Sequence, residues 1–121
     1  MSDLLFAYGT LRGDGAEPAV LVGFRKRTDG PYPTIEPSEG DEVEGALVAV
    51  DDWAEKDRYE GRNPHSPERS LYWRLTAADG VQMYVGNPEH AAECWGPQHA
   101  WDVGYDRQTV ADALAETEVF R

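Results

Sequence analysis

Short apolar runs that end at glycine mark the first strands predicted from the sequence. Residues Leu4–Ala7 (LLFA) are apolar and lead into Tyr8-Gly9, which is typical of a buried strand stopped at a glycine turn. Residues 20–26 (VLVGFRK) predict a second strand. Residues 42–50 (EVEGALVAV) alternate apolar positions with small or polar ones. This alternation predicts a third strand, in which Gly45 is a bulge or a point of close approach.

Capping residues predict a short helix after the third strand. Asp52 is followed three positions later by Glu55, a spacing typical of a helix N-terminus. The stretch up to Tyr59 holds neither glycine nor proline, and Gly61 ends it. We therefore predict one or two helical turns, followed by a proline-containing loop.

The second half of the chain predicts a hairpin and a terminal helix. Residues 71–76 and 81–85 are rich in aromatic and β-branched side chains, and they flank Ala-Asp-Gly at 78–80, a strong signal for a β-hairpin. Apolar side chains recur at helical spacing over residues 107–116, which predicts an amphipathic helix.

Three segments carry loop signals instead. Residues 12–18 (RGDGAEP) hold two glycines and a proline and predict a loop. The prolines of residues 30–37 (GPYPTIEP) indicate a sheet edge or a turn, because proline cannot donate to a strand ladder. Residues 87–104, rich in Trp, His, Gly and Pro, are interpreted as irregular structure.

The composition fits one folded domain. The 121 residues (13.5 kDa) are 40% hydrophobic and 28% charged, so we assign residues 1–121 to a single domain. No apolar stretch approaches the about 18 residues of a membrane span, and the first residues lack the features of a secretory signal. The single Cys94 cannot form an internal disulfide. We therefore expect a cytoplasmic protein without a membrane partner, either a monomer or a homodimer.

The net charge restricts the partners. Eleven basic and 23 acidic side chains give a formal charge of −12. Such a field repels phosphate backbones, so we expect no nucleic-acid partner. The charge alone would also suit an acidic mimic of nucleic acid that occupies a DNA-binding protein.

The turn after the first strand is a candidate anion site. In Tyr8-Gly9-Thr10-Leu11-Arg12 (YGTLR), glycine lets the backbone turn tightly, so that successive N–H groups can point at one negatively charged group. The alternative is an ordinary turn, because glycine is the usual turn residue.

A second candidate lies at the end of the predicted short helix. In residues 57–61 (DRYEG), the Glu60 carboxylate stands beside an aromatic residue and a glycine turn. Partial desolvation there would raise its pKa and suit it to proton transfer near neutral pH. The alternative is a solvated surface carboxylate, one among 23 acidic residues.

Taken together and in order, these motifs resemble those of the gamma-glutamylcyclotransferase-like family. That family opens with a strand running into YGTLR or a close variant and later carries a Leu-Asp-x-x-Glu-Gly type of turn. Between them, residues 32–35 (YPTI) and 43–47 (VEGAL) are similar to further family segments, and residues 72–74 (YWR) follow in the same order. The resemblance covers about residues 4 to 85.

The resemblance implies an α+β fold, a small mixed β-barrel with flanking short helices and a pocket at one end. It implies that the backbone of Tyr8, Gly9, Thr10 and Leu11 holds a small-molecule γ-glutamyl substrate and that Glu60 is the acid and base. The products would be 5-oxoproline and a free amine, with no metal and no organic cofactor. Tyr72 and Tyr84 are candidates for the pocket wall, with core filling as the alternative.

Two alternatives stay open. A non-catalytic module that binds a small molecule or a protein could keep the same barrel and pocket. His90, Cys94 and His99 could begin a zinc site, since thiolate and imidazole are zinc ligands. Their spacing matches no common zinc pattern, and an interior cysteine with two surface histidines is the simpler interpretation.

Overall fold

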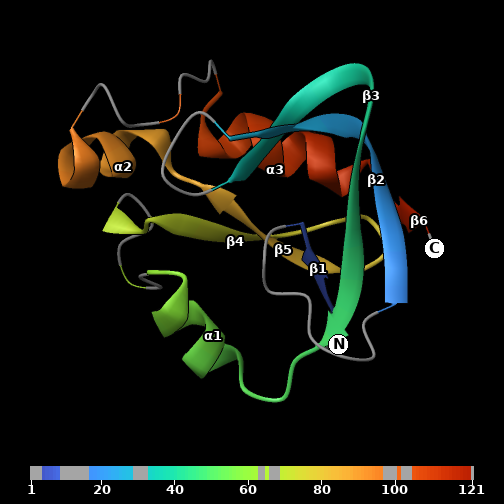
Figure 1. The fold of residues 1–121 in the computed structure, drawn as a ribbon, viewed down its shortest axis with the longest axis horizontal. Helices are drawn as coiled ribbons and strands as arrows, with labels where there is room; N and C mark the ends of the chain where they lie inside the picture. The colour runs from blue at the N-terminus through green and yellow to red at the C-terminus, as the bar shows by residue number, and fades with distance from the viewer. Residues whose placement is uncertain are drawn as a thin grey trace.

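The computed structural model describes residues 4–8, 17–28, 33–62, 65, 69–96, 101 and 105–120. Figure 1 shows one curled sheet with short helices around it. The strands are β1 (Leu4–Ala7), β2 (Glu17–Arg27), β3 (Thr34–Ala49), β4 (Tyr72–Thr76), β5 (Gln82–Gly86) and β6 (Val119–Phe120). The helices are α1 (Trp53–Tyr59), α2 (Pro88–Trp95) and α3 (Arg107–Ala115).

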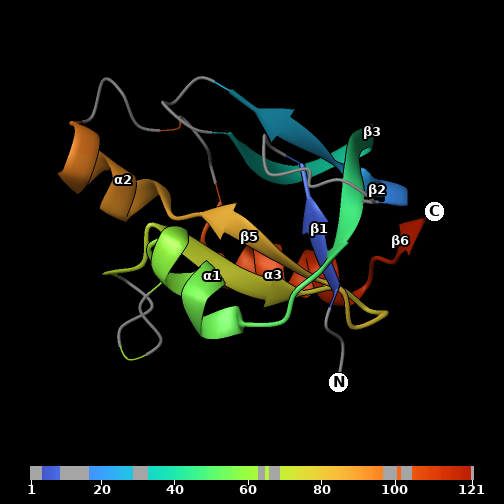
Figure 2. The ribbon, with the colours of Figure 1, turned by 60° about the horizontal axis from the view of Figure 1, so that its bottom comes forward.

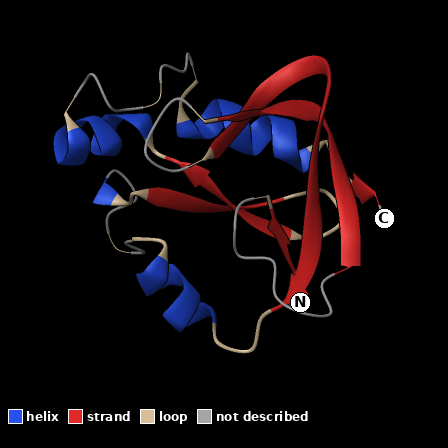
Figure 3. Ribbon diagram, in the orientation of Figure 1, coloured by secondary structure: helices blue, strands red, loops and turns tan. Residues whose placement is uncertain are grey.

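The six strands form one mixed sheet in the order β4-β5-β1-β3-β2-β6. Strand β1 runs antiparallel to β3 and parallel to β5, while β2 and β3 form a long antiparallel ribbon. Figure 3 shows how this ribbon bends over the rest of the sheet. The α+β class with a mixed sheet and short helices is confirmed. The described strands curl into a half-barrel rather than closing, because β4 and β6 each have a single neighbour.

Alternating side chains of the sheet build two apolar clusters. On β4 and β5, Trp73, Met83 and Val85 face a cluster closed by Val110 and Leu114 of α3. Their neighbours Tyr72 and Tyr84 face the opposite side, together with Leu5, Val50, Ala91 and Trp101. Strand periodicity therefore divides one hairpin between two packed layers. Figure 2 shows α1 and α2 near the same end of this hairpin.

Two glycines explain local features of the sheet. Gly45 lies against β1, where an added Cβ would stand 2.5 Å from the carbonyl oxygen of Ala7 and 2.8 Å from Cζ of Phe6. The predicted close approach is therefore confirmed. The irregularity in the ladder lies elsewhere, between Val22 and Phe24, where Gly23 has a φ of +87°. A left-handed glycine at such a point permits the bend of the ribbon.

The structure confirms most predicted elements and corrects others. The strands at 4–7 and 20–26, the hairpin, α1 and α3 are where the sequence predicts them. The prediction of irregular structure over 87–104 is wrong for residues 88–95, which form α2: the Asn87 side chain accepts from the His90 N–H and Pro88 occupies the first turn. Residues 34–37 belong to β3 and residues 17–18 to β2.

Proline at position 37 is tolerated in β3 for a physical reason. In the described ladders, residues 34–37 and 42–45 of β3 pair with β2 alone, while β1 pairs with residues 46–49. Pro37 therefore lies where one side of the strand needs no donor, which agrees with the expected edge character of this stretch. Among the helices that the structure describes, none has the length and apolar character required to cross a membrane.

Candidate functional site

The predicted site residues fall into two groups. Gly9, Thr10 and Leu11 lie outside the described residues, as do Arg12 and the first residues of the 12–18 loop. Tyr8, Glu60 and Tyr72 are described and belong to three different parts of the fold: the end of β1, the end of α1 and the start of β4.

Glu60 is the C-cap of α1, and a tight turn holds its backbone. The Arg62 N–H donates to the Asp57 carbonyl at 2.8 Å, and the Gly61 N–H donates to the Arg58 carbonyl at 3.3 Å. Gly61 has a φ of +70°, the left-handed conformation that closes such a Schellman motif. At the other end of α1, the Asp52 side chain accepts from the Glu55 N–H at 3.1 Å, as predicted. Both ends of the helix are therefore defined by its own sequence.

A buried carboxylate fixes the last turn of α1 to the sheet. Asp57 is 8% exposed and forms ion pairs with Arg62 at 2.7 Å and with Arg74 of β4 at 3.2 Å. The Tyr84 hydroxyl donates to its Oδ1 atom at 2.7 Å. The Arg74 guanidinium also lies over the Trp53 ring, 4.8 Å from its centroid. A seven-residue helix is marginal by itself, so these contacts decide where Glu60 lies.

Tyr8 ends β1 in a fully packed environment. Its hydroxyl donates to the Tyr84 carbonyl oxygen of β5. Burial raises the pKa of Tyr8 well above its usual value, and the Tyr72 and Tyr105 hydroxyls and the Glu60 carboxylate raise it further. The same carboxylate contributes to the raised pKa of Tyr84. For both tyrosines, the Glu60 carboxylate is the smallest of the causes that raise the pKa.

Burial makes the Glu60 carboxyl a weaker acid than usual. The side chain is half-buried, and desolvation raises its pKa above the usual value, against the opposing charge of Lys56. A carboxyl group with a raised pKa can both accept and release a proton closer to neutral pH. The half-buried position of Glu60 therefore suits it to proton transfer at the end of α1.

Tyr72 contributes its ring and its hydroxyl to fixed contacts. The hydroxyl donates to the Pro33 carbonyl oxygen at 2.7 Å, and the ring meets the Trp101 ring edge-on at 5.5 Å. Gly86 lies beneath Trp101, where an added Cβ would stand 2.4 Å from the indole. Tyr72 therefore joins the start of β3 to the layer that carries α1 and α2.

A polar group near Tyr72 was not predicted from the sequence. It consists of Thr34, Gly86 and Tyr105. The Thr34 hydroxyl oxygen accepts from the Gly86 N–H at 2.7 Å and lies 3.4 Å from the Tyr105 hydroxyl. Thr34 belongs to the YPTI segment on which the family resemblance partly rests, so a polar residue inside that apolar stretch was the available signal.

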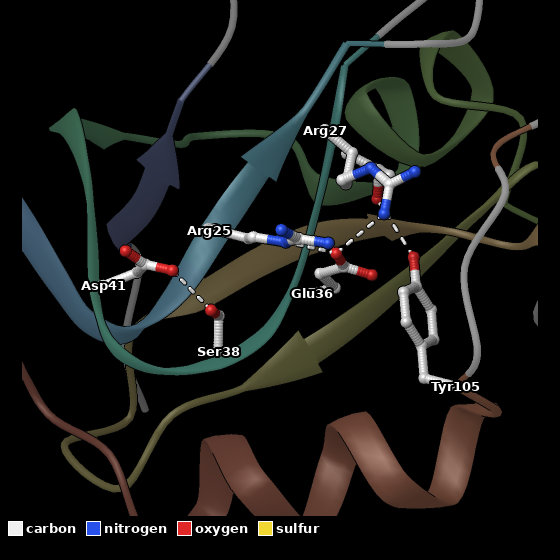
Figure 4. A network of polar contacts seen from close by, with 7 residues as sticks. Arg25, Arg27, Glu36, Ser38, Asp41 and Tyr105 are labelled. Atoms are coloured by element: carbon white, nitrogen blue, oxygen red, sulfur yellow. Dashed lines mark hydrogen bonds and ion pairs between the residues drawn. The ribbon is translucent and has the colours of Figure 1, made fainter.

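A second charged group lies beside Tyr105. Glu36, buried on β3, pairs with Arg25 and with Arg27 of β2, the latter at 2.9 Å. Figure 4 shows both guanidinium groups directed at the Glu36 carboxylate, with the Tyr105 hydroxyl pointing toward Arg27. Arg27 stands opposite Thr34 in the β2–β3 ladder. Two guanidinium groups on one carboxylate leave this end of the ribbon locally positive.

The proposed zinc ligands are not assembled in the described residues. The Cys94 Sγ atom lies 3.5 Å from Nε2 of His90, one turn earlier in α2, and His99 lies outside the described residues. The part of the chain that the structure describes holds no group of three or more metal-binding side chains. The interpretation of Cys94 as an interior residue is wrong, because its side chain is exposed on α2.

Comparisons with known proteins give structural similarity alone. Neither a model of a known family nor a curated protein matches the chain. The solution structure of At5g39720.1 from Arabidopsis thaliana is similar, with a TM-score of 0.51 and 24% identity over 93% of this chain and 83% of that chain. A solved structure described as gamma-glutamyl cyclotransferase has a TM-score of 0.45 and 18% identity, over 92% of this chain and 96% of that chain. The first similarity supports the arrangement of strands and helices and says nothing about activity.

Proposed function

We propose that the chain is a gamma-glutamylcyclotransferase-like enzyme that converts a γ-glutamyl amine or γ-glutamyl peptide to 5-oxoproline and a free amine. The ordered motifs of the sequence support this proposal. The observation that carries it is the half-buried Glu60 carboxyl, whose raised pKa reflects burial and whose charge acts on Tyr8. In the proposal, residues 1–121 form one domain that acts on a small molecule.

The reaction needs one group that moves a proton in both directions. Glu60 takes a proton from the α-ammonium group of the substrate, and the freed amine attacks the side-chain carbonyl carbon to form the new C–N bond. The oxygen then carries negative charge, which backbone N–H groups of residues 9–11 stabilise. Glu60 returns the proton to the departing nitrogen, and the old C–N bond breaks. The attacking nitrogen, which is positively charged once the new bond forms, gives up its second proton through Glu60 to the departing amine. The products that leave are therefore 5-oxoproline and a protonated amine.

Most of the acceleration comes from holding the substrate folded. Ring closure is intramolecular, so an enzyme that presents the amine to the carbonyl removes much of the entropic barrier. The tyrosine hydroxyls that surround this region are already engaged: Tyr8 and Tyr72 donate to backbone carbonyls, and Tyr84 donates to Asp57. They give a rigid wall, and the proton chemistry falls to Glu60. Proton transfer of this kind requires no metal and no organic cofactor.

The test measures 5-oxoproline release by mass spectrometry from γ-glutamyl amino acids, γ-glutamyl amines and glutathione. We expect product with the unmodified chain and a loss of at least about 100-fold in Glu60→Gln, because the amide cannot transfer the proton. Glu55→Gln, at an exposed position of the same helix, is the matched control and should keep full activity. If the folded protein releases no 5-oxoproline from any of these compounds, the non-catalytic binding module becomes the better hypothesis.

A further inference from the structure

We infer that Tyr84 is a positioning residue, which links α1 to the end of β1 and so sets the place of Glu60 relative to Tyr8. The inference rests on the proposed function, because it assigns a role toward Glu60 as the acid and base. Tyr84 itself has no polar group that is free to react with the substrate. Its side chain is 5% exposed and its hydroxyl is directed at Asp57.

Tyr84 contacts both parts of the candidate site. Its hydroxyl donates to Asp57 Oδ1 at 2.7 Å, three residues before Glu60. Its backbone carbonyl accepts the Tyr8 hydroxyl, one residue before Gly9. One residue in the middle of β5 therefore holds elements that are 49 positions apart in the sequence (57 − 8 = 49).

The position of Asp57 determines the position of Glu60 through the backbone. The Asp57 carbonyl accepts the Arg62 N–H at 2.8 Å, which closes the turn that contains Glu60. Any shift of Asp57 along the sheet therefore shifts the whole turn. Because α1 has only seven residues, its own hydrogen bonds do not fix its orientation.

The tyrosine hydroxyl is suited to a permanent link. Burial raises the pKa of Tyr84, and the hydrogen bond to Asp57 and its negative charge raise it further. The hydroxyl therefore stays protonated at pH values at which an ordinary tyrosine would ionise. Asp57 has two further partners, Arg62 and Arg74, so removing the hydroxyl alone leaves the helix docked. The role of the link can thus be separated from folding.

Tyr84→Phe removes the hydroxyl and keeps both the ring and the carbonyl that accepts from Tyr8. With the γ-glutamyl substrates above, we expect kcat to fall by at least about 10-fold, because small displacements of a reacting group cause rate losses of this size. We expect KM to change by less than about twofold. The acid limb of the kcat profile should move to lower pH, because a less constrained α1 end exposes Glu60 to water. The groups that act on Glu60 or that it acts on are Lys56 of α1, Tyr8 after β1 and Tyr84 of β5.

Thr117→Val is the matched control. It removes a half-buried hydroxyl that donates to the Ala113 carbonyl at 2.8 Å, after the end of α3, where the Thr117 carbonyl accepts from the Ala78 N–H of the hairpin turn. It should lower stability to a similar degree and leave both kcat and the pH profile unchanged. If Tyr84→Phe behaves like this control, or if neither its kcat nor its acid limb changes, the inference is overturned.

Two further measurements keep the inference distinct from the proposed function. If the unmodified chain has no cyclotransferase activity, the titration of the Glu60 carboxyl by carbon NMR still tests it: Tyr84→Phe should lower the pKa of Glu60, and an unchanged titration overturns the link. With an active enzyme, the effects of Asp57→Ala and Tyr84→Phe on kcat should be less than additive, because both remove the same hydrogen bond. Additive effects would contradict the proposed route through Asp57.

Discussion

The Glu60 carboxyl is half-buried at the C-terminal end of a helix, where both desolvation and the helix dipole disfavour its negative charge. Its pKa is therefore higher in the folded chain than in the unfolded chain. A group of this kind contributes most to stability when it is protonated. That contribution is lost as the pH rises from the ordinary value near 4.5 through the folded pKa.

Glu60→Gln should therefore make the protein more stable at pH 7, while abolishing the proposed activity. The gain should be less than about 1 kcal/mol, because the side chain remains partly solvated. At pH 4 the gain should be smaller, since the carboxyl is then largely protonated in both states. Urea unfolding at the two pH values measures this difference, and a variant equally stabilised or destabilised at both would contradict the assigned burial effect.

Gly45 is required by the backbone rather than by a turn. The atom nearest to an added Cβ is the Ala7 carbonyl oxygen, at 2.5 Å, and a backbone atom of a paired strand cannot move aside. Gly45→Ala should therefore cost about 2 kcal/mol of unfolding free energy. Because the strain acts on Ala7, it should also disturb Tyr8 and lower the proposed activity. Glu42→Ala, exposed on the same strand, should change stability by less than about 0.5 kcal/mol in the same unfolding experiment.

At the level of elements, α1 can be tested by removing one end signal at a time. Gly61→Ala forces an alanine into a left-handed conformation, and its Cβ would stand 3.0 Å from Leu71 Cβ. Asp52→Ala removes the N-cap. Each should cost about 1 kcal/mol of unfolding free energy. Only Gly61→Ala should also lower kcat, because it alone distorts the turn that carries Glu60; equal loss of activity in the two variants would mean that Glu60 depends on helix stability alone.

Short-range sequence signals predicted the elements whose ends depend on short-range interactions. The cap at Asp52, the stop at Gly61 and the Asp-Gly turn are short-range features, and the structure has all three. Helix α2 was missed although Asn87-Pro88 is a sound N-terminal signal, because the tryptophans and histidines that follow obscure any helical period. The start of β3 was missed because pairing with β2, rather than its own sequence, keeps residues 34–37 extended.

The arrangement of the candidate site was predictable only in part. The sequence indicated Tyr8 and Glu60 separately, through a glycine turn and a helix end. The packing of Tyr8 depends on Tyr84, which lies 76 positions away and carries no local signal for that contact. The Asp57 ion pairs likewise join residues that only the sheet brings together. Long-range polar contacts of this kind follow from topology and cannot be derived from periodicity.

For the whole molecule, the formal charge of −12 contrasts with a small positive region at the end of the β2–β3 ribbon. The overall field acts on ligands before they bind, over distances that salt reduces to about 10 Å at 0.1 M. Arg25 and Arg27 share one carboxylate, so their charge acts at short range and against the overall field. These two influences can be separated by ionic strength, because added salt screens the distant charges more strongly than the near ones.

The proposed enzyme should therefore prefer cationic leaving amines at low salt and lose this preference as salt is added. We expect the ratio of kcat/KM for a γ-glutamyl diamine to that for glutathione to fall several-fold between about 0.02 M and 0.5 M NaCl, as the Debye length shrinks to a few ångströms. A neutral γ-glutamyl methylamide corrects for general effects of salt on the enzyme and should change little. If the ratio is already below one at low salt and rises with added salt, local positive charge governs the site. Arg25→Gln, which removes the more exposed of the two guanidinium groups, should then move the ratio toward the diamine.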